Sequence, residues 1–144
     1  MDSKITAVTF DLWDTIIDDE SDEPKRAQQG LRSKSDERHQ LVLEALNKHE
    51  PISSADLAVG YGVVNAAFLK CWKGHSITWT VKERLSVLLA GLNRKLPEVE
   101  LDALAYAQER LELDVPPDPI VGAKEAVAEL ANRYKLCVIS DTII

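Results

Sequence analysis

The spacing of hydrophobic positions changes from strand-like to helix-like and back along the chain. Residues 5–10 (ITAVTF) are a short β-branched and aromatic run, which predicts a strand buried in a parallel sheet, and residues 135–140 (KLCVIS) are a second run with a strand pattern. Between them, apolar residues recur at three-to-four spacing, which predicts helices. The expected helical ranges are 36–48, 54–73, 80–92, 97–111 and, just before the second strand, 122–132.

Polar interruptions divide these elements into two parts. Residues 18–35 are charged and polar and contain Pro24 and Gly30, so we expect an exposed, mobile connection there. Residues 114–119 (DVPPDP) stop helix formation and resemble a hinge. We therefore predict a partial α/β core from residues 1–17 and 115–144. Residues 18–114 are expected to form a helical lobe whose N-terminal connection is mobile.

Composition narrows the classes of function. The 144 residues are 45% hydrophobic and 28% charged, as in a globular protein, with a formal net charge of −7. That charge disfavours binding to nucleic acid. No apolar run reaches the roughly 20 residues that span a bilayer, and the N-terminus lacks the apolar region of a signal peptide. We expect a cytoplasmic protein with no membrane segment.

Polar residues follow both predicted strands, at the sheet edge where open α/β sheets place their chemistry. Asp11 ends the first run, and its carboxylate could attack an electrophile, hold a divalent cation or cap the following turn. Thr15 could offer its hydroxyl and backbone amide to an anion. Ser140 places a second hydroxyl at the end of the second run. Together these residues indicate a site for an anionic group.

The stretches VTFDLWDTI and PPDPIVGAKEAVAELANRYKLCVISDT, separated by the helical lobe, resemble the haloacid dehalogenase (HAD) superfamily of hydrolases. Its first motif corresponds to Asp11 to Thr15 and its second to Ser140. The resemblance implies a partial Rossmann-like core, with two parallel strands and a helix, and an inserted α-helical cap. It also implies that Asp11 is the nucleophile, that Ser140 contacts the transferring group, and that Asp11 and the Trp13 backbone carbonyl bind Mg²⁺ in phosphatase members.

The sequence departs from the phosphatase pattern in two places. Phosphatase members carry an acid two positions after the nucleophile, whereas this chain has Trp13 there, followed by Asp14. Asp14 is a candidate for the acid or for a cap of the turn. The lysine and the acidic metal motif that follow the second motif in the family are absent, because the chain ends four residues after Ser140. We therefore expect a truncated hydrolase that is inactive on its own.

Three functions remain open on these residues. The first is a phosphate-monoester phosphatase that uses Mg²⁺ and a small anionic substrate. The second is a 2-haloacid dehalogenase without a cofactor, which Trp13 favours because a halide leaves without protonation. The third is a catalytically silent binding or assembly module.

Two further expectations concern the surroundings of this site. Trp72 and Trp79 are candidates for lining a substrate pocket, and the alternative for both is helix packing. Two strands alone are a marginal sheet, so we expect a second copy of the chain or another segment to complete it.

Overall fold

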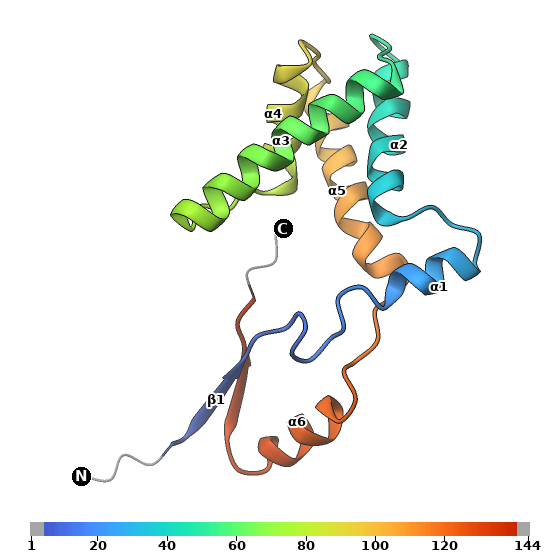
Figure 1. The fold of residues 1–144 in the computed structure, drawn as a ribbon. Helices are drawn as coiled ribbons and strands as arrows, with labels where there is room; N and C mark the ends of the chain where they lie inside the picture. The colour runs from blue at the N-terminus through green and yellow to red at the C-terminus, as the bar shows by residue number, and fades with distance from the viewer. Residues whose placement is uncertain (1–4, 141–144) are drawn as a thin grey trace. The chain divides into compact units, whose positions relative to one another are not determined.

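The computed structural model describes residues 5–140, which form two compact units (Figure 1). Residues 5–31 and 115–140 make up the α/β unit, and residues 32–114 the helical unit. The elements in chain order are β1 (Ala7–Phe10), α1 (Asp22–Gln28), α2 (Lys34–Asn47), α3 (Ser54–His75), α4 (Val81–Gly91), α5 (Glu98–Asp114), α6 (Ala123–Ala131) and β2 (Lys135–Val138). Residues 1–4 and 141–144 of the predicted core segments lie outside the described part. None of the helices described combines the length and the apolar character needed to cross a bilayer.

The two strands pair in parallel, with Ala7 opposite Lys135 and Phe10 opposite Val138. Helix α6 precedes β2 and begins at Ala123, directly after its N-cap residue Gly122, whose φ of +84° is a conformation that favours glycine. The prediction that residues 5–10 form a buried strand is wrong. Residues of β1 alternate between exposed and half-buried, and Val138 in β2 is 50% exposed. The reason is that each strand has a single strand neighbour within residues 5–140.

Helix α1 corrects the prediction that residues 18–35 form an exposed, mobile connection. Its first turn contains Asp22 and Glu23 and its last turn contains Lys25 and Arg26, a charge order that complements the helix dipole. Pro24 falls in the first turn, where the missing N–H would have no partner within the helix. The helix also contributes to packing, since Asp22 and Arg26 are both buried.

The end of α1 is defined by Gly30, whose φ is +71°. The Gly30 N–H donates to the Ala27 carbonyl at 3.0 Å, and the Leu31 N–H donates to the Arg26 carbonyl at 3.0 Å. These two bonds form the Schellman motif, in which a left-handed residue closes the last helical turn. A proline and a glycine that suggested a loop are therefore the start and stop signals of a short helix.

The helical unit has one apolar core, to which α2, α3, α4 and α5 all contribute. The core residues are Val42, Leu46, Leu57, Val64, Leu85, Leu88, Leu89, Leu101, Leu104 and Ala105. Helices α3 and α4 pack closely at Gly60, because a Cβ there would lie 2.9 Å from a methyl carbon of Leu92. Burial of these residues is the main favourable term in the folding of this unit.

Polar contacts also connect the helices of this unit. The Glu112 carboxylate on α5 pairs with Arg38 and, at 2.9 Å, with Lys34, both on α2. The buried Gln108 donates from Nε2 to the Tyr61 hydroxyl on α3 at 3.1 Å. Burial raises the pKa of Tyr61, so its hydroxyl is neutral at physiological pH. These bonds fix α5 against α2 and α3.

Helix α4 begins with a capping box, so we expect Thr80→Ala to destabilise the protein by about 1 kcal/mol. The Thr80 Oγ1 accepts from the Glu83 N–H at 3.1 Å, and the Glu83 carboxylate accepts from the Thr80 N–H at 2.7 Å. Urea unfolding followed by far-UV circular dichroism measures the change. The nearby Thr78→Ala is the matched control, and an equal loss in both variants would contradict the role assigned to the capping box.

Candidate active site

The pairing of β1 with β2 brings the two predicted motifs to the same sheet edge. Because the strands are parallel and Phe10 lies opposite Val138, both strands end at this edge. The pairing continues one step further, since the Ile139 N–H donates to the Phe10 carbonyl at 2.8 Å. Asp11 directly follows Phe10, and Ser140 directly follows Ile139. Two residues far apart in the sequence thus end neighbouring strands.

The Asp11 side chain is exposed at the end of β1. Its Oδ1 accepts a hydrogen bond from the Leu12 N–H at 2.7 Å. This bond orients the carboxylate, and it occupies only part of the accepting capacity of the two oxygens. The group is therefore accessible and held in place, as a nucleophile or a cation ligand requires.

The segment after Asp11 folds into a compact turn. The Leu12 carbonyl accepts from the Ile16 and Ile17 N–H groups at 2.9 and 3.0 Å, and the Asp14 N–H donates to the Ile17 carbonyl at 2.7 Å. Thr15 lies exposed within this turn. The N–H groups of Leu12, Asp14, Ile16 and Ile17 thus all donate within this segment, so they are not open to an anion.

Asp14 is bound into the same turn by its side chain. Its Oδ1 accepts from the Asp19 N–H at 3.4 Å, and its backbone has a φ of +53°, in the left-handed region that aspartate tolerates. The half-buried Trp13 stands between Asp11 and Asp14. The contact of Asp14 is that of a turn cap, the second of the two roles considered for it.

The segment at residues 118–120 is hydrogen-bonded to this turn. The Ile120 N–H donates to the Ile16 carbonyl and the Asp18 N–H to the Asp118 carbonyl, both at 2.9 Å. Lys25 on α1 pairs with Asp118 at 3.0 Å and donates to the Pro116 carbonyl at 2.5 Å. The proline-rich segment predicted as a hinge is thus bonded to the residues that follow Asp11.

Sequence reasoning missed Lys25, because residues 18–35 were expected to be a solvated loop. Lys25 is a positioning residue, since it holds the 116–118 segment and contacts no candidate nucleophile. The signal that could have found it is the order of charges across 22–26, with two acids followed by two bases, which is typical of a helix.

The oxygen atoms at this sheet edge are of the kind that binds Mg²⁺, but they are few. The Asp11 carboxylate and the Trp13 carbonyl supply oxygen atoms, which Mg²⁺ prefers. Among residues 5–140, no group of three or more His, Cys, Asp or Glu side chains could hold a metal ion. A magnesium ion held here would take most of its ligands from water and substrate, as Mg²⁺ commonly does in phosphate-transferring sites.

The two tryptophans proposed to line a pocket belong to an aromatic cluster around Phe68. The Trp79 ring lies 6.0 Å from the Phe68 ring and packs against the helical core. The Trp72 ring stacks on Phe68 at 6.3 Å and is partly exposed. Their observed contacts are those of helix packing.

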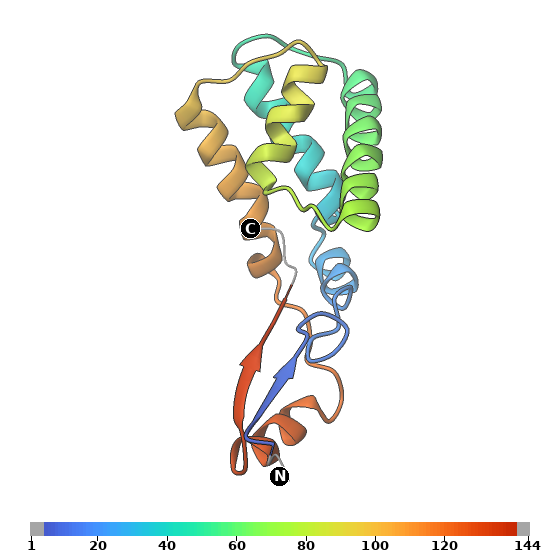
Figure 2. The same cartoon turned by 90° about the vertical axis from the view of Figure 1, so that its left-hand side faces the viewer.

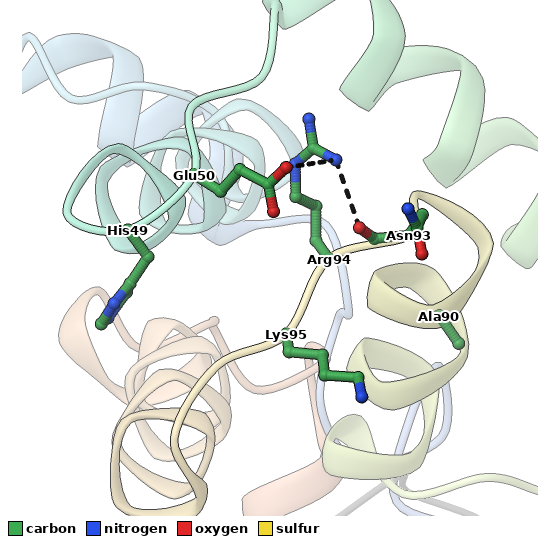
Figure 3. A pocket seen from close by; sticks show the side chains of 6 residues that line it. All are labelled: His49, Glu50, Ala90, Asn93, Arg94 and Lys95. Carbon is green, nitrogen blue, oxygen red and sulfur yellow. Dashed lines mark hydrogen bonds and ion pairs between the residues drawn. The ribbon is translucent and has the colours of Figure 1, made fainter.

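The helical unit also contains a pocket of about 700 Å³ that includes none of the predicted site residues (Figure 3). It is lined by His49, Glu50, Ala90, Asn93, Arg94 and Lys95. Arg94 pairs with Glu50 at 3.3 Å and donates to the Asn93 carbonyl at 3.2 Å. The charged groups here connect the α2–α3 loop to the α4–α5 loop, which indicates a structural role.

Similarity to known proteins is found among solved structures. No protein-family model matches the sequence, and no curated protein matches it. Among solved structures, the chain is similar to a Bacillus subtilis protein, YfnB, assigned to the HAD-hydrolases and crystallised bound to magnesium. The two are 16% identical with a TM-score of 0.48, over 98% of this chain and 56% of YfnB. The chain thus spans little more than half of that protein's length.

Proposed function

We propose that the protein is a HAD-like hydrolase of the phosphate-monoester phosphatase type, with Asp11 as its nucleophile. The observation that supports this most is the parallel pairing of β1 and β2, after which Asp11 and Ser140 end neighbouring strands. A nucleophilic carboxylate and a hydroxyl donor at one sheet edge are the groups that the family's reaction needs on either side of a phosphoryl group.

The proposed reaction has two steps. An oxygen of the Asp11 carboxylate attacks phosphorus, the ester P–O bond breaks, and the alcohol leaves with a proton taken from water. Water then attacks the aspartyl phosphate and releases inorganic phosphate and the free carboxylate. The hydroxyls of Thr15 and Ser140 donate to the phosphoryl oxygens in both steps. When bound, Mg²⁺ supplies the positive charge that offsets repulsion between the carboxylate and the phosphate.

A second candidate is a 2-haloacid dehalogenase, which the contacts of Asp14 favour. Its Oδ1 accepts from the Asp19 N–H, and Trp13 occupies the position of the acid in phosphatase members. A halide leaves without a proton, so this reaction needs no acid near Asp11. In it, Asp11 attacks the carbon that carries the halogen, and water hydrolyses the resulting ester.

A further part of the proposal concerns the sheet. Val138 at the end of β2 is half exposed and Ile139, which follows it, is 64% exposed, so these apolar residues are open to a covering element. We propose that a second copy of the chain or another polypeptide segment extends the sheet, since a two-stranded sheet is marginal in water.

A parallel assay on the purified chain distinguishes the candidates. One reaction contains an aryl phosphate with Mg²⁺, and the other contains a 2-haloacid without metal. In the phosphatase proposal, any phosphate release depends on Mg²⁺ and is accompanied, after an acid quench, by one phosphoryl group on the peptide that contains Asp11. Halide release alone would establish the dehalogenase, and the absence of both products and of the covalent intermediate would support the silent module.

A further inference from the structure

Helix α3 carries an unusually long stretch without charge. From Leu57 to Leu69 there is no Asp, Glu, Lys or Arg. One side of this stretch packs into the helical core through Leu57, Val64 and Phe68. The opposite side is open, since Val59 is 68% exposed and Val63 is 65% exposed. The helix is therefore apolar on a face that the core does not use.

The two views of the helical unit agree on where this face lies. Helix α3 lies at one edge of the four helices, in front in Figure 1 and on the right in Figure 2. A Cβ placed on Gly62, between the two exposed valines, would meet no atom within 4 Å. Helices that are apolar all round are normally covered all round. This face is expected to have a partner.

The charges at the ends of the stretch indicate which partner fits. Asp56 lies seven positions before Val63 and Lys70 seven positions after it, so the three residues share one helix face two turns apart. If two copies of α3 pack antiparallel with Val63 at the centre, each Asp56 lies opposite the Lys70 of the other copy. Within residues 5–140, no carboxylate lies within ion-pair distance of Lys70. The face is complementary in charge to itself.

From this geometry we propose that α3 is a self-association surface, and that its occupant is α3 of a second copy packed antiparallel across a two-fold axis. A two-fold contact uses the same patch on both copies, which a self-complementary face provides. Gly62 and Ala66 lack bulk beside the valines and allow the two helix backbones to approach. The inference is independent of the proposed hydrolase activity.

Sedimentation equilibrium over a range of concentrations tests the proposal directly. The unmodified chain is expected to show a reversible monomer–dimer equilibrium. Val63→Glu places two carboxylates beside the axis and should weaken the dimer by more than about tenfold. The matched control is Val99→Glu on α5, where Val99 is 79% exposed, and it should leave the equilibrium unchanged. Far-UV circular dichroism verifies that both variants are folded.

Charge reversal provides a second, more specific arm. Lys70→Glu places like charges at both ends of the pair and should weaken the dimer. The double variant Asp56→Lys with Lys70→Glu restores opposite charges and should recover most of the lost affinity. Recovery is a result that general loss of stability would not produce.

Three results would overturn the inference. The first is a chain that stays monomeric at every concentration. The second is a dimer that Val63→Glu leaves unchanged and that Val138→Lys on β2 weakens. That result would assign the association to the sheet. The third is a monomeric chain in which Val63→Glu, but not Val99→Glu, lowers the free energy of unfolding. That result would indicate that another part of the same chain covers α3. The phosphoryl-transfer assay described above is unaffected by any of them, so the two proposals fail separately.

Discussion

Replacing Asp11 by asparagine is expected to abolish phosphorylation of the protein and to lower Mg²⁺-dependent phosphate release by at least about 10³-fold. The amide has nearly the shape of the carboxylate, and its oxygen can still accept the Leu12 N–H that orients Asp11. It has no negative charge and is a poor nucleophile, so the aspartyl phosphate cannot form. Mass spectrometry of the peptide and a phosphate assay measure the two effects.

The control for this substitution is Asp14→Asn, which also removes one negative charge, three residues further along the chain. Its side chain accepts from the Asp19 N–H, a bond that asparagine can also accept, so we expect less than about a tenfold loss. Phosphate release that survives Asp11→Asn would remove Asp11 from the reaction. A large loss in Asp14→Asn alone would instead make Asp14 the acid of the proposed phosphatase.

The positions of the strands and of most helices could be predicted from the sequence, because the spacing of apolar residues differs between strands and helices. Residues 5–10 and 135–140 were expected to be strands, and β1 and β2 lie within those ranges. The expected helix at 54–73 corresponds to α3, which ends at His75. Burial of the strands could not be predicted in this way. It depends on how many neighbours a strand has, and that number is not encoded in its own alternation of residues.

Helix α1 shows a second limit of sequence reasoning. Five of its seven residues are polar or charged, so no hydrophobic period marks it, and Pro24 and Gly30 suggested a loop. Its signals are positional, with a proline in the first turn and a glycine in the left-handed conformation just after the end. A proline or a glycine indicates a loop at most positions, but at these two positions it indicates the start or the end of a helix. Only the hydrogen bonds of the folded chain distinguish a loop from a short helix here.

The candidate site was partly predictable for a related reason. That Asp11 and Ser140 share a sheet edge follows from the parallel pairing expected for two strands joined through a helix. The conformation of the turn does not follow. The left-handed backbone of Asp14 and its bond to the Asp19 N–H depend on the bonds that the Leu12 carbonyl makes to Ile16 and Ile17. The contact that Asp14 makes with the Asp19 N–H therefore could not be predicted from the sequence.

The largest expected effect on stability comes from truncating the centre of the helical core. Leu46 on α2 is 0% exposed and packs in the cluster formed by α2 to α5. Leu46→Ala removes buried methyl groups and leaves a cavity, so the free energy of unfolding should fall by about 2–5 kcal/mol. Since small proteins are stable by only about 5–15 kcal/mol, this loss is a large part of the total.

Urea unfolding followed by far-UV circular dichroism and by tryptophan fluorescence measures the loss. Trp79 packs against the same core, so its emission should change in the transition that Leu46→Ala shifts. Val99→Ala, on the exposed side of α5, is the control and should change stability by less than about 0.5 kcal/mol. If both variants lost equally little, the cluster around Leu46 would not be the core of this unit. Coincident circular dichroism and fluorescence transitions in Leu46→Ala would show that α2 to α5 unfold together.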